Sequence, residues 1–304
     1  MVVSVTSKRL SSLGEGPHWD EKSKVLWHVD ALSGDVCRLD VETQETDVVH
    51  LNGKVVSLVI PYASDPDKLV VTVDREIRQL SWKNQSCKLL QEVDLDKPDN
   101  NFNDGKCDKI GRLWAGTKAF EKIPTVIEPE QGTLYSLDSD LLLRKHVDKI
   151  SISNGMVWNL GYTIMFYIDS FLRKIYAFDF DLVHGTLSNQ RTLVDFNVVP
   201  AYQECGFPDG MTIDCEGKLW VACYDGGRII RIDPETAQIL RTVKFPVQKI
   251  TSCCFGGPNY DELFVTSAWV GLSDDMRKDQ PQAGAVFRVS ELGVTGLPHE
   301  RFAG

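Results

Sequence analysis

The chain has 304 residues, of which 42% are hydrophobic and 25% are charged, and this composition is typical of a folded globular protein. Its formal net charge of −10 argues against nucleic-acid binding, because contacts with phosphates need a basic surface. The longest apolar runs, such as residues 69–73, have the length of a strand and are far too short to span a membrane. We therefore expect partners other than nucleic acids and membranes.

The first residues, "MVVSVTSKRL", lack the charged start and apolar stretch of a secretory signal. The eight cysteines are therefore expected to be reduced thiols in the cytoplasm. No two of them have the Cys-x-x-Cys spacing of a zinc site. Cys253 and Cys254 are adjacent, which predicts that they lie on opposite faces of a buried strand.

Similar units recur along the chain. Residues 15–30, "EGPHWDEKSKVLWHVD", and 154–169, "NGMVWNLGYTIMFYID", each begin with a carboxylate or amide and a glycine, and each ends in an apolar strand and an aspartate. Residues 104–116 and 209–222 share Asp-Gly followed by Asp-x-x-Gly-[Arg/Lys]-Leu-Trp. With two weaker copies, the units begin near residues 15, 57, 104, 154, 209 and 252.

Each unit has room for four short strands separated by turns. In the first unit we expect strands near residues 16–20, 25–29, 35–40 and 46–50, with turn residues such as "LSGD" between them. Six units of this kind, with almost no helical periodicity, predict an all-β fold: a six-bladed β-propeller with four-stranded blades around a central channel. We expect residues 1–304 to form this single domain. The N-terminal strand would complete the last blade and close the ring.

The first strand of each propeller blade lines the channel, so the leading residue of each unit is expected to point toward the axis. These residues carry oxygen atoms and are not accompanied by thiols or histidine pairs: Glu15, Ser57, Asn103 or Asp104, Asn154, Asp209 and Ser252. Such oxygen ligands favour Ca²⁺, with Mg²⁺ or Mn²⁺ as alternatives and Zn²⁺ less expected. Taken singly, each position is also explained as a turn or capping residue. Together, acidic groups inside a channel would be costly without a cation, so Glu15, Asn154 and Asp209 are predicted to bind one divalent ion.

Several segments resemble the regucalcin family, also called senescence marker protein or gluconolactonase, which includes the insect luciferin-regenerating enzymes. They include "GEGPHWD", "NDGKCD", "ISNGMVW" and "FPDGMTIDCEGKLWVACYDGG", and the resemblance extends over essentially the whole chain. It implies a six-bladed propeller with one divalent metal in its channel and lactonase activity on sugar lactones. It also implies Glu15, Asn154 and Asp209 as the metal ligands.

The resemblance further implies three substrate-binding positions, Asn101, Asn103 and Glu121. Asn101 departs from the family pattern, which has arginine there. An asparagine is shorter and uncharged, so a sugar lactone would bind more weakly or the preferred substrate would differ. Lys118 stands where the family usually has methionine. One alternative is that it reaches into the site and compensates for Asn101, but its neighbours favour a position at the rim, facing solvent.

Together with the resemblance, these residues predict a divalent-metal-dependent lactonase in which the metal would polarise the lactone carbonyl and Asp209 would be the catalytic base. Asn103 would orient the substrate, and Glu121 would bind a hydroxyl group from a lid formed by residues 121–132. A small lactone is the expected partner, and a monomer or a weak dimer the expected state.

Two alternatives remain. The first is an ester hydrolase with a non-sugar substrate, because residues 56–82 resemble the luciferin-regenerating branch. The second is a non-catalytic Ca²⁺-binding regulatory protein. A single channel site without paired helices gives the second alternative little support.

Overall fold

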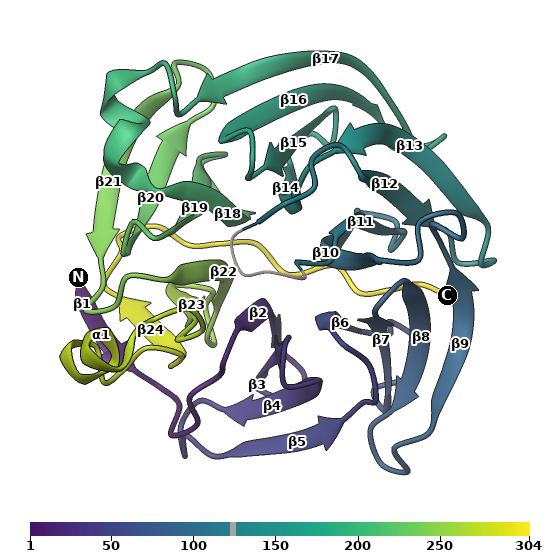
Figure 1. Cartoon of the computed structure of the whole chain (residues 1–304), viewed down its shortest axis with the longest axis horizontal. Helices are drawn as coiled ribbons and strands as arrows, with labels where there is room; N and C mark the ends of the chain where they lie inside the picture. Colours follow the sequence, from purple (N-terminus) through teal and green to yellow (C-terminus); the bar gives the residue numbers. More distant parts are fainter. Residues whose placement is uncertain (122–125) are drawn as a thin grey trace.

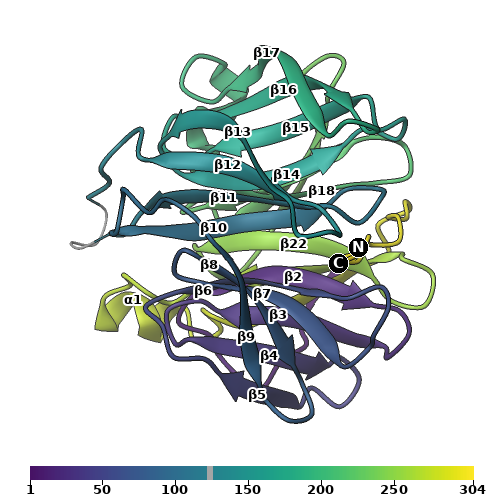
Figure 2. The same cartoon turned by 90° about the vertical axis from the view of Figure 1, so that its right-hand side faces the viewer.

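The computed structural model describes residues 1–121 and 126–304, which contain six four-stranded antiparallel sheets arranged in a ring. Figure 1 views the ring along its channel, with the first strand of each blade innermost. Figure 2 shows the same blades from the side. The predicted all-β, six-bladed β-propeller is confirmed.

The first three blades follow the chain from the inner to the outer strand. They are β2 (Gly14–Asp20), β3 (Val25–Asp30), β4 (Asp35–Asp40) and β5 (Thr46–His50); β6 (Val56–Pro61), β7 (Lys68–Val73), β8 (Glu76–Ser81) and β9 (Cys87–Glu92); and β10 (Asn100–Cys107), β11 (Leu113–Ala119), β12 (Gly132–Leu137) and β13 (Leu143–Ile150). The four strands predicted for the first unit are therefore present at the expected places.

The next two blades have the same order, and the sixth takes its outer strand from the N-terminus. They are β14 (Ser153–Trp158), β15 (Ile164–Asp169), β16 (Lys174–Asp181) and β17 (Thr186–Asp195); β18 (Phe207–Ile213), β19 (Leu219–Tyr224), β20 (Arg228–Asp233) and β21 (Gln238–Lys244); and β22 (Ile250–Gly256), β23 (Glu262–Ser267), β24 (Phe287–Ser290) and β1 (Val2–Val5). A 3₁₀ helix η1 (Pro200–Cys205) and a short helix α1 (Asp274–Asp279) lie in connections. No helix in the described part of the chain is long and apolar enough to cross a bilayer.

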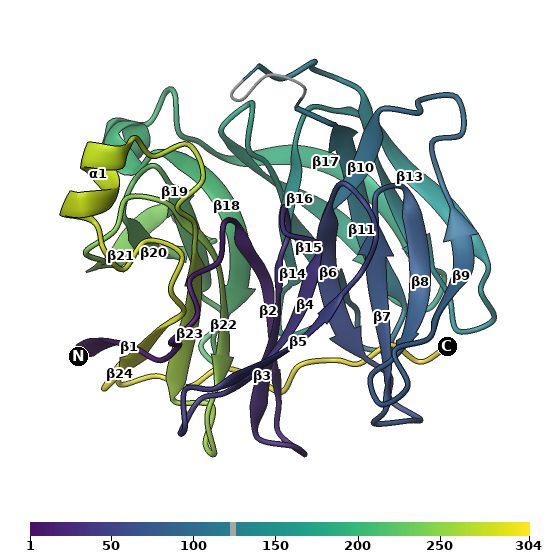
Figure 3. The same cartoon turned by 60° about the horizontal axis from the view of Figure 1, so that its bottom comes forward.

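Both ends of the chain tie the ring together. Strand β1 pairs antiparallel with β24, as predicted, so the first and last units share one blade. The segment after β24 crosses the ring at one end of the channel (Figure 3). Thr295 accepts a backbone hydrogen bond from Cys215 in blade 5, and Phe302 forms a bridge with Tyr62 in blade 2. The C-terminal segment therefore covers that end of the channel.

The core lies between neighbouring blades, where alternate side chains of each strand enter different apolar clusters. Cys253 packs in the cluster that contains Trp220. Its neighbour Cys254 packs with Trp19 and Phe264 in another cluster. The prediction of opposite faces is confirmed, and all eight cysteines are free thiols.

The repeated Asp-x-x-Gly-[Arg/Lys]-Leu-Trp segment is a turn held by its aspartate. The indole N–H of Trp114 donates to the Asp108 carboxylate at 2.9 Å, and that of Trp220 donates to Asp214 at 2.8 Å. Arg231 also donates to Asp214, at 2.7 Å. Both aspartates are fully buried, so each carboxylate satisfies donors that have no access to water.

Replacing Asp214 with alanine should lower the free energy of unfolding by about 1–3 kcal/mol, because it leaves the buried indole N–H of Trp220 without its acceptor. Arg231 would keep only its contact with the more exposed Glu216. Chemical denaturation, followed by tryptophan fluorescence, measures this. Asp275 on the exposed helix α1 pairs only with Lys278 at the surface. Asp275→Ala is the control and should change stability by less than about 0.5 kcal/mol. Equal effects of the two substitutions would contradict the proposed role of the turn.

Candidate active site

Aspartates at the ends of second strands hold the backbone that leads into inner strands. In three blades such a carboxylate accepts a hydrogen bond from a backbone N–H: Leu13 to Asp30 (3.1 Å), Val55 to Asp74 (3.0 Å) and Ile152 to Asp169 (3.1 Å). In each case the predicted channel residue follows two positions later, and these residues are Glu15, Ser57 and Asn154. The aspartate that ends the repeated unit thus fixes the entry to the site.

The inner strands change register at the channel residues. In all six blades, the pairing of the first strand with the second is interrupted at or beside the predicted position. In β10 the break falls between Phe102 and Asp104, so Asn103 has no partner in the ladder. Such bulges redirect side chains that regular pleating would send between the blades. They bring the polar residues to one end of the channel.

The glycines after the channel residues allow inner strands to approach one another. A Cβ atom on Gly155 would lie 2.6 Å from the backbone oxygen of Asp209, and one on Gly210 would lie 2.0 Å from the Ser252 hydroxyl. The Asn-Gly and Asp-Gly pairs lie inside strands β14 and β18 and are not turn dipeptides. The structure therefore does not support the turn interpretation of these pairs.

The predicted ligands Asn154 and Asp209 are connected through a serine. The Asn154 amide nitrogen donates to the Ser170 hydroxyl at 2.9 Å, and Ser170 donates to the Pro208 backbone oxygen at 2.6 Å. These contacts leave the amide oxygen of Asn154 and Oδ1 of Asp209 buried, with no hydrogen-bond partner among the described residues. Two unsatisfied buried acceptors side by side are the arrangement that a cation would complete.

Electrostatic repulsion concentrates at the same place. Burial, followed by the nearby charges of Asp209 and Asp104, raises the pKa of Glu15 well above its ordinary value. Burial and the charge of Asp104 likewise raise the pKa of Asp209, while hydrogen bonding by Asn154 opposes the shift. Each carboxylate would be stabilised in its charged form by a nearby cation.

The donor set fits a divalent ion with oxygen ligands. Glu15, Asn154 and Asp209 offer two carboxylates and one amide from three different blades. In the described ranges, no cluster of three or more histidine, cysteine, aspartate or glutamate side chains forms a metal site, and the predicted set has only two such residues. Three protein ligands leave coordination positions for water and a substrate.

Of the predicted substrate residues, Asn103 lies beside these ligands, whereas Asn101 lines a separate cavity. Asn103 donates from its side-chain nitrogen to the backbone oxygen of Ser153 at 2.7 Å, next to Asn154 in the chain. Asn101 is buried; its nitrogen donates to the Phe102 carbonyl at 2.6 Å, and its oxygen has no partner among residues that the structure describes. Asn101 also borders a cavity of about 150 Å³ lined mainly by polar and charged residues.

Lys118 is placed differently from the prediction. Its side chain is only 15% exposed, and its ammonium group lies 2.7 Å from the Glu121 carboxylate. Lys118 and Asn101 are direct partners in the β10–β11 ladder. The expectation of a solvent-facing rim position is therefore wrong, because the strand pairing turns the side chain inward. Of the predicted lid, residues 122–125 lie outside the described part of the chain.

Tyr224 is a site residue that sequence reasoning missed. It follows Cys223 at the end of β19 and pairs with Phe207. Burial, together with the charges of Asp225, Asp209, Glu121 and Glu15, raises its pKa above the ordinary value. Tyr224 is therefore a neutral phenol among the acidic side chains. No motif distinguishes it from the apolar residues that end other second strands.

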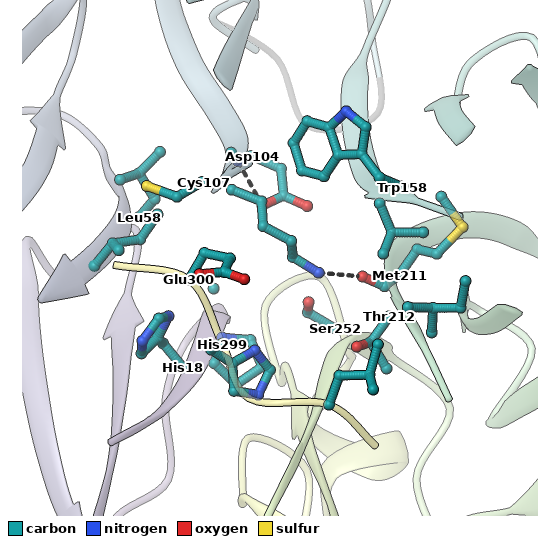
Figure 4. Close-up of a pocket in the computed structure, with 18 of the residues that line it drawn as sticks. His18, Leu58, Asp104, Cys107, Trp158, Met211, Thr212, Ser252, His299 and Glu300 are labelled. Carbon is teal, nitrogen blue, oxygen red and sulfur yellow. Dashed lines mark hydrogen bonds between the residues drawn. The ribbon is translucent and has the colours of Figure 1, made fainter. Parts of the chain in front are cut away.

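A second cavity, of about 70 Å³, is lined by residues of the inner strands and of the C-terminal segment (Figure 4). Lys106 donates from its ammonium group to the Met211 carbonyl at 2.7 Å. The rings of His18 and His299 lie 5.1 Å apart. Burial lowers the pKa of His299 to about 4. His18 lines this cavity, and the C-terminal segment brings His299 against it.

The fold and its site can now be compared with known proteins. Residues 13–269 match the family described as "SMP-30/Gluconolactonase/LRE-like region". Regucalcin of Xenopus laevis is 45% identical over 303 residues, covering 100% of this chain and 97% of the relative. Regucalcin of Gallus gallus is 46% identical over 292 residues, covering 96% and 95%. The chain belongs to the SMP-30/gluconolactonase/LRE-like family.

The comparison with solved structures agrees. A luciferin-regenerating enzyme superposes with a TM-score of 0.92 at 36% sequence identity, covering 100% of this chain and 99% of that protein. The resemblance found in the sequence motifs is thus confirmed for this SMP-30/gluconolactonase/LRE-like protein. The roles of Glu15, Asn154, Asp209, Asn101, Asn103 and Glu121 stay predictions.

The raised pKa of Asp209 predicts the pH dependence of stability in the metal-stripped protein. Because the folded state holds this proton more tightly, stability should fall as pH rises from the ordinary carboxyl pKa of 3.8 through the raised value. Asp209→Asn should therefore flatten the decline and increase stability at pH 7 by roughly 1–3 kcal/mol, the scale for relieving an unsatisfied buried group. Urea unfolding in chelator between pH 5 and 8 measures both proteins. If the free energies of unfolding of the two proteins change in parallel with pH, the pKa of Asp209 is not raised in the folded state.

Proposed function

We propose that this protein is a divalent-metal-dependent lactonase that hydrolyses sugar lactones at the channel end formed by Glu15, Asn154 and Asp209. The observation that carries the proposal is a pair of buried oxygen atoms, on Asn154 and Asp209, that have no hydrogen-bond partner in residues 1–121 and 126–304. A second carboxylate, Glu15, accompanies Asp209, and burial and the charge of Asp209 raise its pKa. Oxygen donors favour Ca²⁺, and Mg²⁺, Mn²⁺ or Zn²⁺ can use the same set. The family match, whose description includes gluconolactonase, supports the choice of reaction.

A bound divalent ion would supply Lewis-acid polarisation of the lactone carbonyl and a lower pKa for a water molecule. Asp209 accepts the proton of the attacking water on a carboxylate oxygen, as the water oxygen bonds to the carbonyl carbon. The ring C–O bond then breaks, and the proton returns to the departing ring oxygen, which gives a hydroxy acid. Burial raises the pKa of Asp209 in the metal-free chain, whereas a bound cation would favour its charged form, which is the form that accepts the proton.

Other residues of the chain position the substrate. The Asn103 nitrogen is held by the Ser153 carbonyl, so its amide oxygen is oriented to accept a hydroxyl of the lactone. Glu121, fixed by Lys118 at 2.7 Å, supplies a second acceptor. Because the C-terminal segment covers the other end of the channel, the substrate approaches from the end that carries the predicted ligands. The eight free thiols support the expected cytoplasmic setting.

The first test is hydrolysis of D-glucono-δ-lactone by metal-stripped protein, titrated separately with Ca²⁺, Zn²⁺, Mn²⁺ and Mg²⁺, with spontaneous hydrolysis subtracted. We expect metal-dependent turnover that falls at least about 100-fold in Asp209→Asn, since both a ligand charge and the base are lost. Asp233, which forms a salt bridge with Lys218 away from the channel, gives the matched control Asp233→Asn. Turnover that survives both chelation and Asp209→Asn would exclude this site. Metal binding without turnover would instead indicate a calcium-binding regulatory role.

Asn101 favours a second candidate, an ester hydrolase of the luciferin-regenerating type with a non-sugar substrate. An asparagine here offers no guanidinium to sugar hydroxyls, and its shorter side chain borders the cavity of about 150 Å³. The TM-score of 0.92 with a luciferin-regenerating enzyme supports this alternative equally well.

Asn101→Arg should lower KM for gluconolactone about tenfold with little change in kcat, because the added donors bind the substrate in ground and transition state alike. Steady-state kinetics at saturating metal provides the measurement, with Asn101→Leu as the uncharged control. The predicted gain would mean that the native chain lacks this sugar contact and prefers another substrate. A KM unchanged by arginine would instead mean that Asn101 does not face the bound sugar.

A further inference from the structure

We propose that Lys118 is a built-in counter-cation of the channel site and that its ammonium charge weakens the binding of a divalent ion there. The inference rests on the metal site of the proposed function and concerns the affinity of that site. Lys118 is neither one of the equivalent positions of the repeat nor a predicted metal ligand, so its role in the site is a separate question.

The backbone places Lys118 at the seam between two blades that both contribute to the site. In the β10–β11 ladder it lies opposite Asn101, the residue that departs from the family pattern. On the other side it forms an isolated antiparallel bridge with Ile152, two positions before the predicted ligand Asn154. Asp169 holds the same Ile152 through a backbone hydrogen bond at 3.1 Å. The position of Lys118 is therefore fixed by the contacts that fix Asn154.

The side chain of Lys118 turns toward the acidic groups. It is 15% exposed, and the ammonium lies 2.7 Å from Glu121, whose side chain is 34% exposed. The charge of Lys118 also lowers the pKa of both Glu15 and Asp209, against the larger effect of burial. Its field thus reaches both carboxylates that are predicted to hold the ion.

The charge balance determines the sign of the effect. At a pH where Glu15 and Asp209 are ionised without the ion, their attraction to Lys118 exists before and after binding, so it largely cancels from the binding free energy. Repulsion between Lys118 and a dication appears only in the bound state and directly weakens binding. The nearby Glu121 screens part of this repulsion but remains in place in both states. Removing the lysine charge should therefore strengthen the binding of a divalent ion, although Lys118 stabilises the charged carboxylates when no ion is bound.

The test compares metal binding by four metal-stripped proteins: the native chain, Lys118→Met, Lys118→Arg and Lys54→Met. Calorimetry measures the binding of Ca²⁺, and electron paramagnetic resonance measures the binding of Mn²⁺. We expect Lys118→Met to bind each ion about tenfold more tightly than the native chain, and Lys118→Arg, which keeps the charge, to bind like the native chain. Lys54 is exposed and contacts the Phe120 ring at 5.4 Å, so Lys54→Met removes a surface charge and should leave affinity unchanged. The gain in Lys118→Met should shrink as salt is added.

The outcomes separate this inference from the proposed function. Native binding with no gain in Lys118→Met, or with weaker binding, would overturn the role of Lys118 and leave the metal site standing. A gain that Lys118→Arg shares would show that packing and not charge is responsible, which also overturns it. No binding by any of the four proteins would overturn both. Lys118→Gln serves as a second neutral variant, should Lys118→Met unfold in the chelator control.

Discussion

The site depends on hydrogen bonds between a buried carboxylate and the backbone that enters an inner strand. Asp30 and Asp169 each close such a contact at 3.1 Å, two positions before Glu15 and Asn154. A loop without this anchor could place those side chains only loosely, since its backbone N–H would be satisfied by water in many conformations. With this hydrogen bond, the backbone before the channel residue is fixed relative to the sheet, and the position of the channel residue is therefore well defined. The aspartate at the end of each of these units is thus needed to position the channel residue at its start.

The fixed backbone also brings acidic side chains that repel one another close together at one end of the channel. Glu15 and Asp209 are held close enough that each raises the cost of ionising its neighbours, and burial adds to that cost. The propeller can bear this cost because its stability comes from elsewhere, mainly from apolar side chains packed between blades. Local strain at a functional site is tolerated when the surrounding fold determines the backbone. Here the backbone is fixed by a ring of antiparallel sheets, which the pairing of β1 with β24 closes.

The sequence predicts the fold because the repeat encodes the blade. Its strands, its turn residues and the buried tryptophans recur at intervals that only a propeller explains, so both the blade number and the ring closure follow from it. The candidate ligands follow for the same reason, since they occupy equivalent places in each unit. Other site features break the repeat and therefore escape prediction. The register shifts of the inner strands depend on pairing with a neighbour, and the approach of His299 to His18 depends on a segment outside the repeats.

Lys118 and Asn101 illustrate the same limit at a finer scale. In the sequence they are separate departures from a family pattern, 17 positions apart. In the structure they are cross-strand partners, so a change at one alters the space and charge available to the other. A cation at position 101 would extend toward the substrate, whereas the cation at 118 lies against Glu121 and acts on Glu15 and Asp209. This pair therefore keeps one positive charge near the channel, close to the predicted metal ligands and not at the position where the family pattern has arginine. If the proposed metal site and lactone site are both present, metal affinity and substrate preference are coupled through this one pair of cross-strand neighbours.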